Sequence, residues 1–181
     1  MQQSAVFLLA FALLGSTIPV ASAQVSVRDY GAKGDDKTDD TEAFVAALRA
    51  SRDVYVPAGV YQIGTIELAD QTWLHGAGRA SVIRFVSDKD SRAAIYVGTA
   101  CRVSSLRLTG TEPFENWITG KGSMEPVLLR AQGKRDIQID RVQLDDFRHN
   151  GIWIDNCEDV RIENCVLEKL FQGLEIDNCK R

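Results

Sequence analysis

The residues of this chain best suited to acid–base chemistry lie in its C-terminal third. His149 closely follows Asp145 and Asp146, and Glu175 occurs one repeat further along. A histidine beside a carboxylate can transfer protons near neutral pH, so these four residues form the candidate catalytic set. A structural interpretation stands beside it, because aspartates often form turns and a single histidine in a turn is often structural.

A second group of side chains is suited to binding a sugar polymer. Aromatic faces stack on sugar rings, and arginine pairs with the carboxylate of a uronic acid through two parallel hydrogen bonds. The candidate substrate-binding residues are Tyr96, Arg130, Trp153, Trp117 and Arg148. In a lyase, a base would remove the proton next to the uronate carboxylate while Arg130, Arg148 or Lys169 stabilised the resulting charge. The alternative is packing, in which a loop covers the outward aromatic rings.

An internal repeat predicts the elements that position these residues. Residues 150–157 (NGIWIDNC) return as residues 172–179 (QGLEIDNC), a step of 22, and residues 137–144 return as residues 160–167, a step of 23. A fixed period of this length is typical of stacked architectures, and the short alternating runs within each unit predict strands. The chain is therefore predicted to be all-β, a solenoid of strands.

Alternation along the strands predicts which side chains face outward. If Ile152 and Ile154 point into the core, Trp153 points out. Its equivalents on neighbouring rungs are Tyr96, Arg130 and Glu175. The pattern predicts one outer stripe, with a polar insertion at residues 109–125 close to it.

The N-terminal part of the predicted domain reads as a cap. Residues 26–30 predict an entry strand, residues 31–36 a turn, and residues from Thr38 onward a helix with capping-box spacing between Asp39 and Glu42. A helix placed before a solenoid covers the open end of its core. The predicted organisation is an entry strand and cap helix over residues 24–52 and rungs over residues 53–181.

The composition and the N-terminal residues limit the partners and the cellular location that can be expected. The formal net charge of −4 argues weakly against nucleic acid and anionic membranes as partners. Residues 5–14 are an unbroken apolar run followed by Ala21-Ser22-Ala23, which predicts a signal peptide over residues 1–23 and a secreted product, extracellular or periplasmic. The sequence sets no oligomeric state.

The four cysteines leave two interpretations open. Cys101, Cys157, Cys165 and Cys179 are compatible with buried thiols in a solenoid interior, and Cys157 and Cys179 also occupy equivalent positions suited to a disulfide. The sequence contains no cysteine–histidine cluster of the kind that binds a metal, so no metal site is predicted, and it implies no cofactor. Calcium is not indicated, because the aspartates of residues 35–40 lack the usual ligand spacing.

Three segments resemble a known superfamily. Residues 29–35 (DYGAKGD), 38–41 (TDDT) and 54–61 (VYVPAGVY) resemble the N-terminal signature of the pectate-lyase-like superfamily, which includes polygalacturonases, rhamnogalacturonases, and related lyases and epimerases. The resemblance implies a right-handed parallel β-helix with an N-terminal capping helix. The same fold hosts several reactions, so the resemblance alone does not fix the chemistry.

The polygalacturonase branch provides a sharper comparison. Its first catalytic stretch falls on residues 148–151 of this chain and its second near residues 170–173. Asn150 stands where the first catalytic aspartate would be, and residues 170–173 contain no acid. Inverting hydrolysis needs a general acid and a general base, and an amide is neither. These rungs therefore lack that catalytic set.

The chain stops after the turn at Cys179 without a visible C-terminal cap, so it is expected to be the N-terminal part of a longer protein with an incomplete β-helix. We expect a secreted carbohydrate-active protein that acts on a uronate-containing polysaccharide by glycosidic cleavage or epimerisation, as a polysaccharide lyase or glycoside hydrolase. The alternative is a non-catalytic carbohydrate-binding or surface-scaffold β-helix.

Overall fold

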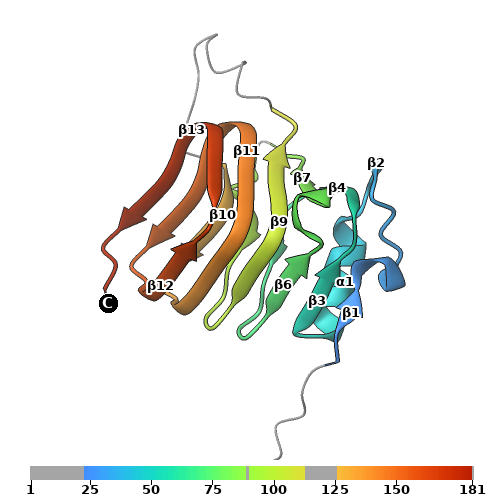
Figure 1. The fold of residues 1–181 in the computed structure, drawn as a ribbon, viewed down its shortest axis with the longest axis horizontal. Coiled ribbons are helices and arrows are strands. Elements are labelled where there is room, and N and C mark those ends of the chain that lie inside the picture. Colours follow the sequence, from blue (N-terminus) through green and yellow to red (C-terminus); the bar gives the residue numbers. More distant parts are fainter. Residues whose placement is uncertain (1–22, 89, 113–125, 181) are drawn as a thin grey trace, which may run out of the picture.

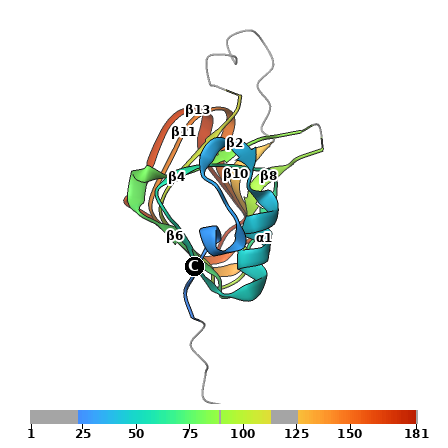
Figure 2. The same cartoon turned by 90° about the vertical axis from the view of Figure 1, so that its right-hand side faces the viewer.

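The protein is a coil of parallel strands wound around an apolar interior. The computed structural model describes residues 23–88, 90–112 and 126–180. Successive turns of the coil stack side by side from the N-terminal end to the C-terminal end (Figure 1), and the end-on view shows helix α1 along one side of the first turns (Figure 2). The predicted all-β parallel β-helix with an N-terminal capping helix is confirmed.

The described elements follow one another in a regular order. They are β1 (Val25–Ser26), the 3₁₀ helix η1 (Val27–Tyr30), β2 (Asp35–Asp39), α1 (Thr41–Ala50), β3 (Asp53–Val56), β4 (Gly59–Ile63), β5 (Ile66–Glu67), β6 (Trp73–Gly76), the 3₁₀ helix η2 (Gly78–Ala80), β7 (Ser81–Phe85), β8 (Ala93–Tyr96), β9 (Arg102–Gly110), β10 (Val127–Gln132), β11 (Arg135–Asp155), β12 (Glu158–Glu163) and β13 (Val166–Asp177).

The strands form three faces of the coil. The first face contains β1, β3, β6, the start of β9, the start of β11 and β12. The second contains β2, β4, β7, the rest of β9, the middle of β11 and the start of β13. The third contains β5, β8, β10, the end of β11 and the end of β13. All of these pairings are parallel.

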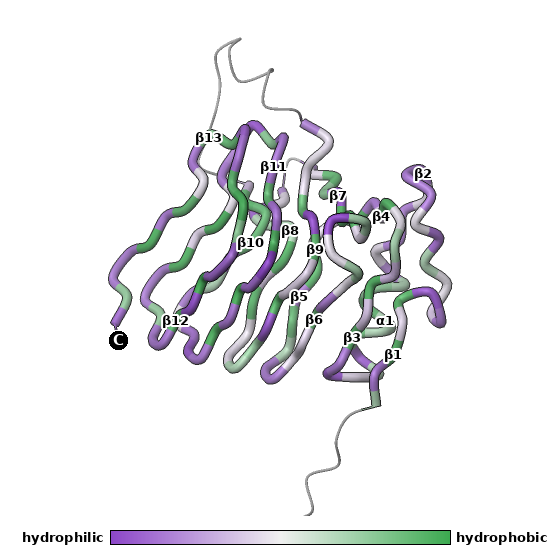
Figure 3. The backbone as a smooth tube through the Cα atoms, viewed as in Figure 1, coloured by the Kyte–Doolittle hydropathy of each residue, from purple (hydrophilic) through white to green (hydrophobic). Residues whose placement is uncertain are grey.

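The register confirms the predicted repeat. Ile139 pairs with Val103 on one side and with Ile162 on the other, so the same position recurs on successive turns. Inward side chains stack in columns, and Val54, Leu74, Val103 and Ile139 are completely buried. Apolar and polar residues alternate along the strands (Figure 3). Burying one such side chain stabilises the fold by about 1.5–3 kcal/mol.

The corners between faces are made by residues in the left-handed backbone conformation. Ser105, Arg141 and Asn164 stack at the corner between the first and second faces, with φ values of 54°, 53° and 55°. Asp146 and Lys169 lie near the next corner, at 51° and 53°. Short polar residues tolerate this conformation better than other non-glycine residues, which explains why aspartate and asparagine are frequent there.

The capping helix differs from the prediction at its start. Helix α1 begins at Thr41 rather than Thr38, because residues of β2 pair with β4 instead of entering the helix. The predicted capping box is absent: the N-cap residue is Asp40, and its side chain makes no capping hydrogen bond. Asp39 instead accepts a hydrogen bond from the Thr41 backbone at 2.9 Å.

The helix nevertheless covers the core as predicted. Phe44 and Leu48 are buried, whereas Val45 is half-buried against the cluster. The Phe44 ring meets the Tyr61 ring edge-on, with centroids 5.6 Å apart. No helix among the residues that the structure describes is long and apolar enough to cross a membrane.

The aspartates of residues 35–40 are used in the local structure. Asp36 pairs with Arg84, and Asp40 accepts hydrogen bonds from the backbone of Lys33 and Gly34. Asp35 accepts the Thr38 backbone N–H at 2.8 Å, and this contact is the main cause that lowers the pKa of its carboxyl.

Three predicted segments have different bounds or lie outside the described residues. The entry strand covers only β1, and residues 27–30 form η1 instead. Strand β9 continues to Gly110, two residues into the predicted insertion, because its end pairs with β7. Most of that insertion, Trp117 included, and residues 1–22 of the predicted signal peptide lie outside the described residues.

The left-handed corners generate a test. Asn156 is exposed and has φ 50°. Asn156→Val is expected to lower the free energy of unfolding by about 1–2 kcal/mol, because a β-branched residue fits this conformation poorly. Asn156→Gly, the matched control, is expected to stay within about 0.5 kcal/mol of the parent. Urea titration measures both, and equal values for the two variants would contradict the account.

Candidate functional site

The predicted outer stripe is present on the third face. Arg130 pairs with both Tyr96 and Trp153, and Trp153 pairs with Glu175 on the next rung. Glu67 of β5 extends the same column beside Tyr96. Adjacent strands are about 4.8 Å apart, so the stripe runs along the coil axis and suits an extended ligand.

Trp153 is held in place by two neighbours. The Arg130 guanidinium carbon lies 4.2 Å from the centre of the Trp153 ring, a cation–π contact. The indole Nε1–H donates to Asp177 Oδ2 at 3.2 Å. Trp153 remains half-buried, so the aromatic and cationic groups form a preorganised pair at the surface.

Glu175 is oriented by Asn150, the residue for which the sequence resemblance predicted the position of the first polygalacturonase aspartate. Asn150 Nδ2 donates to Glu175 Oε2 at 3.0 Å. Asn150 is completely buried, and its Oδ1 has no hydrogen-bond partner among the described residues. The buried amide thus fixes a half-exposed carboxylate at the end of the stripe.

Two further carboxylates beside the stripe were missed from the sequence. Asp177 pairs in register with Asp155, which accepts hydrogen bonds from Gln132 at 3.0 Å and Asn178 at 3.2 Å. Both aspartates occupy the same position of the Ile-Asp-Asn-Cys repeat, two residues after Trp153 and Glu175. Alternation alone would have placed them outward.

The spacing of Glu175 and Asp177 along β13 suits a pair of carboxylates that act together as acid and base. Glu175 and Asp177 are two residues apart on one side of a strand, so their Cα atoms are about 7 Å apart. Both carboxylates therefore project from the same side of β13, and acid–base chemistry on a sugar uses two carboxyl groups that flank the reacting bond. Groups of three or more metal-ligating side chains are absent from the part of the chain that the structure describes.

Asp145 lies in a different environment. It is buried on the second face, where both of its oxygens accept hydrogen bonds from Arg107 Nε at 3.0 and 3.1 Å. Gln143 Nε2 also donates to Asp145. A carboxylate engaged in this way has the features of a structural ion pair rather than of a base open to substrate.

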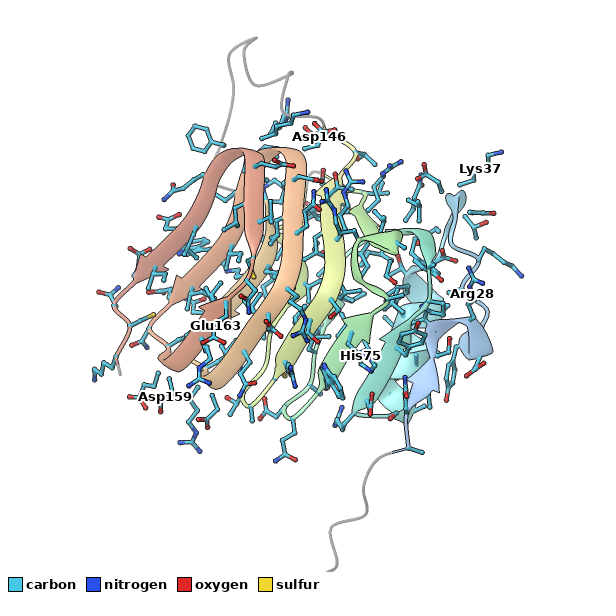
Figure 4. The ribbon with its side chains drawn as sticks, viewed as in Figure 1. Arg28, Lys37, His75, Asp146, Asp159 and Glu163 are labelled. Carbon is cyan, nitrogen blue, oxygen red and sulfur yellow. The ribbon has the colours of Figure 1, made fainter. Side chains whose placement is uncertain are left out.

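Asp146 lies at the corner, at the end of the second face where β11 bends (Figure 4). Its backbone oxygen accepts from Thr109 Oγ1 at 3.4 Å. Its left-handed conformation turns the chain, in agreement with the turn-forming interpretation.

Arg148 and His149 form a β-bulge. Phe147 pairs with Leu170 and Asn150 with Gln172, so two residues of β11 face one residue of β13. The His149 side chain is 5% exposed and lies edge-on to Phe147, with ring centroids 5.1 Å apart. Burial of His149 separates it from the open surface of the stripe.

The bulge contacts Glu112 at the end of the preceding rung. Arg148 Nε lies against Glu112 Oε2 and also donates to His149 Nε2 at 3.1 Å. His149 Nε2 lies 3.7 Å from the same carboxylate, whose other oxygen accepts from Ser87 at 2.8 Å. The carboxylate beside His149 is Glu112, which was not one of the predicted partners Asp145 and Asp146, and Asp145 is bound to Arg107.

The other described histidine belongs to a polar cluster on the first face. His75 hydrogen-bonds Asp53 at 2.8 Å and stacks on Trp73 with ring centroids 4.1 Å apart. His75 of β6 and Glu163 of β12 lie on this face (Figure 4). Nearby, a hydrogen bond from Asn164 and the charge of Arg141 lower the pKa of Asp140. Cross-strand pairs of this kind stabilise a sheet.

The contrast between Asp145 and Asp146 can be measured. Asp145→Asn removes the charge that pairs with Arg107 and should lower the free energy of unfolding by about 2 kcal/mol. Asp146→Asn keeps the corner conformation and should change it by less than about 0.5 kcal/mol. Chemical denaturation of both variants checks this, and a neutral Asp145→Asn would contradict a structural ion pair.

Comparisons with known proteins agree with the fold. A segment of 64 residues is 48% identical to the preneck appendage protein of Bacillus phage PZA, covering 34% of this chain and 8% of that protein. A segment of 91 residues is 35% identical to alginate lyase 7 of Azotobacter vinelandii, covering 42% of this chain and 11% of that protein. The chain thus spans about a tenth of the length of these curated relatives.

A solved structure and a family model complete the comparison. The family 28 exopolygalacturonase of Yersinia enterocolitica superposes with a TM-score of 0.62 over 86% of this chain and 41% of that chain; at 15% identity this shows the fold. The family model described as rhamnogalacturonase A/epimerase, pectate lyase-like, matches residues 24–180. The match confirms the resemblance in residues 29–61, and this chain belongs to the rhamnogalacturonase A/epimerase, pectate lyase-like family.

Proposed function

We propose that the third face binds a uronate-containing polysaccharide and acts on it by acid–base chemistry. The observation that carries this proposal is the Arg130–Trp153 pair in register with Tyr96 and Glu175. Family membership and the alginate lyase relative support the wider statement that the protein is carbohydrate-active.

The stripe has the groups that such a ligand requires. Tyr96 and Trp153 offer aromatic surface to sugar rings, and Arg130 offers a cation to a uronate carboxylate. The column follows the coil axis, so consecutive sugars of one chain would contact consecutive rungs. This is a binding surface for a polymer rather than for a single small molecule.

Glu175 and Asp177 are the proposed acid and base. In β-elimination or epimerisation, one carboxylate takes the proton from the carbon next to the uronate carboxylate, and Arg130 stabilises the negative charge that develops. Elimination then breaks the glycosidic bond, whereas epimerisation returns a proton from the other side. Hydrolysis would use the same two carboxylates, one donating to the leaving oxygen and one activating water.

A specific observation also favours the non-catalytic alternative. Asp145 is tied to Arg107 and His149 is buried, so two of the sequence-predicted catalytic residues have little access to a ligand on the stripe. The phage appendage relative is in keeping with a binding or scaffold β-helix. Export through the signal peptide of residues 1–23 belongs to both versions of the proposal.

Binding is tested by titrating polygalacturonate and alginate into the protein. Trp153→Ala is expected to weaken binding at least about tenfold, because it removes the aromatic surface and frees Arg130 from its stacked position. Tyr55→Ala, a half-buried outward aromatic on the first face, is the matched control and should bind like the parent. Equal affinities for Trp153→Ala and the parent would overturn the proposed face.

Turnover separates the enzyme from the binder. The assay follows unsaturated products, reducing ends and the epimer ratio on the same polymers. Glu175→Gln should lower the rate at least about 100-fold with binding retained, a range common for loss of a proton-transferring group. Glu158→Gln, an exposed acid on β12, should leave it unchanged. Binding without turnover in the full-length parent protein would support the scaffold alternative.

A further inference from the structure

Two cysteines occupy the same position on neighbouring rungs. Cys157 and Cys179 each follow an Asp-Asn pair, and Asn156 and Asn178 both adopt the left-handed conformation, with φ values of 50° and 52°. We propose that Cys157 and Cys179 are a modification site that closes to an inter-rung disulfide when a low-molecular-weight disulfide is supplied. This inference does not depend on the proposed function.

Backbone hydrogen bonds hold the two residues in register. The Lys180 N–H donates to the Cys157 carbonyl at 2.9 Å, and the Asn156 N–H donates to the Asp177 carbonyl at 2.9 Å. Neighbouring parallel strands place equivalent Cα atoms about 4.8 Å apart, within the range of roughly 4.4–6.8 Å found across disulfides. The Cα spacing of the two rungs is therefore compatible with an inter-rung disulfide.

The sulfur of Cys179 already points toward Cys157. The Cys157 backbone N–H donates to Cys179 Sγ at 3.4 Å. Cys157 Sγ points the other way and accepts the Lys134 backbone N–H at 3.4 Å. Closure therefore requires a rotation of the Cys157 side chain, which exchanges this weak sulfur contact for a covalent bond.

The surroundings set the order of the reaction. Both residues are free thiols, Cys157 is buried, and Cys179 is half-buried. Burial raises the pKa of the Cys157 thiol and limits the access of a reagent to it. Cys179 is more exposed than Cys157 and is therefore the better placed first nucleophile.

The chemistry is a thiol–disulfide exchange in two steps. The Cys179 thiolate attacks oxidised glutathione, forms a mixed disulfide and releases one glutathione. The Cys157 thiolate then attacks the mixed disulfide, forms the protein disulfide and releases the second glutathione. Two protein thiols lose two electrons and two protons, and one molecule of oxidised glutathione gains them.

The other two cysteines belong to different columns. Cys101 Sγ contacts the Ala69 carbonyl at 3.2 Å, and Cys165 Sγ contacts the Glu163 carbonyl at 3.2 Å. Cys165 lies in the inward column of Val142 and Leu106. These placements predict that Cys157 and Cys179 form a disulfide and that Cys101 and Cys165 stay reduced.

The experiment treats the folded full-length protein with oxidised glutathione and then digests it with trypsin. Cleavage after lysine and arginine leaves the four cysteines in separate peptides, residues 93–102, 149–161, 162–169 and 170–180. The expected product links 149–161 to 170–180, with the loss of two hydrogens in the intact mass and with Cys101 and Cys165 still reactive toward a thiol reagent. Closing a loop of this length should raise Tm by roughly 5–10 °C.

Two variants sharpen the result. Cys101→Ser should still give the linked peptides, whereas Cys157→Ser should leave a mixed disulfide with glutathione on 170–180. Linkage of either cysteine to another residue, free thiols at both Cys157 and Cys179 after treatment of the folded parent, or a mixed disulfide that persists in the parent would overturn the proposal. The Tm of the treated proteins, measured with and without reductant, is a second readout. The treated parent should have a higher Tm without reductant than with it, and Cys157→Ser should show no such difference.

Discussion

The rest of the structure depends on the in-register hydrogen bonding of each rung to the next. Because every pairing between rungs is parallel, a position on one turn of the coil lies directly beside the equivalent position on the next. That constraint sorts side chains into columns. Inward columns make a continuous apolar interior, and outward columns make continuous surface stripes, so the interior and the candidate site arise from one geometric cause.

The same constraint explains why polar groups occur in small sets rather than singly. Trp153 donates to Asp177 on the next rung, Asn150 donates to Glu175, and Arg107 holds Asp145. Each contact joins neighbouring turns, so it both orients a side chain and ties two rungs together. A substitution in the stripe would therefore be expected to affect orientation first and the packing of the coil second.

Much of the fold could be predicted from the sequence, because the period and the alternation are local signals. The outer stripe from Tyr96 to Glu175 followed from alternation and is present in register. The helix start was wrong because the pairing of β2 with β4 is a long-range contact that competes with helix formation. The position of His149 could not be predicted because the bulge at Arg148 and His149 depends on the neighbouring rung. The same alternation also predicts that Asp155 and Asp177 point outward, although neither was among the predicted site residues.

The bulge has a consequence for how such a chain tolerates insertions and deletions. Between Phe147 and Asn150 the offset to the next rung changes from 23 to 22 residues, and the extra residue lies near a corner. A length change there leaves the inward and outward parity of both flanking faces intact. The same change within a face would turn every following side chain of that face over, exposing apolar groups and burying charged ones. Rungs of unequal length can therefore accumulate in one coil, provided that the difference is confined to its corners.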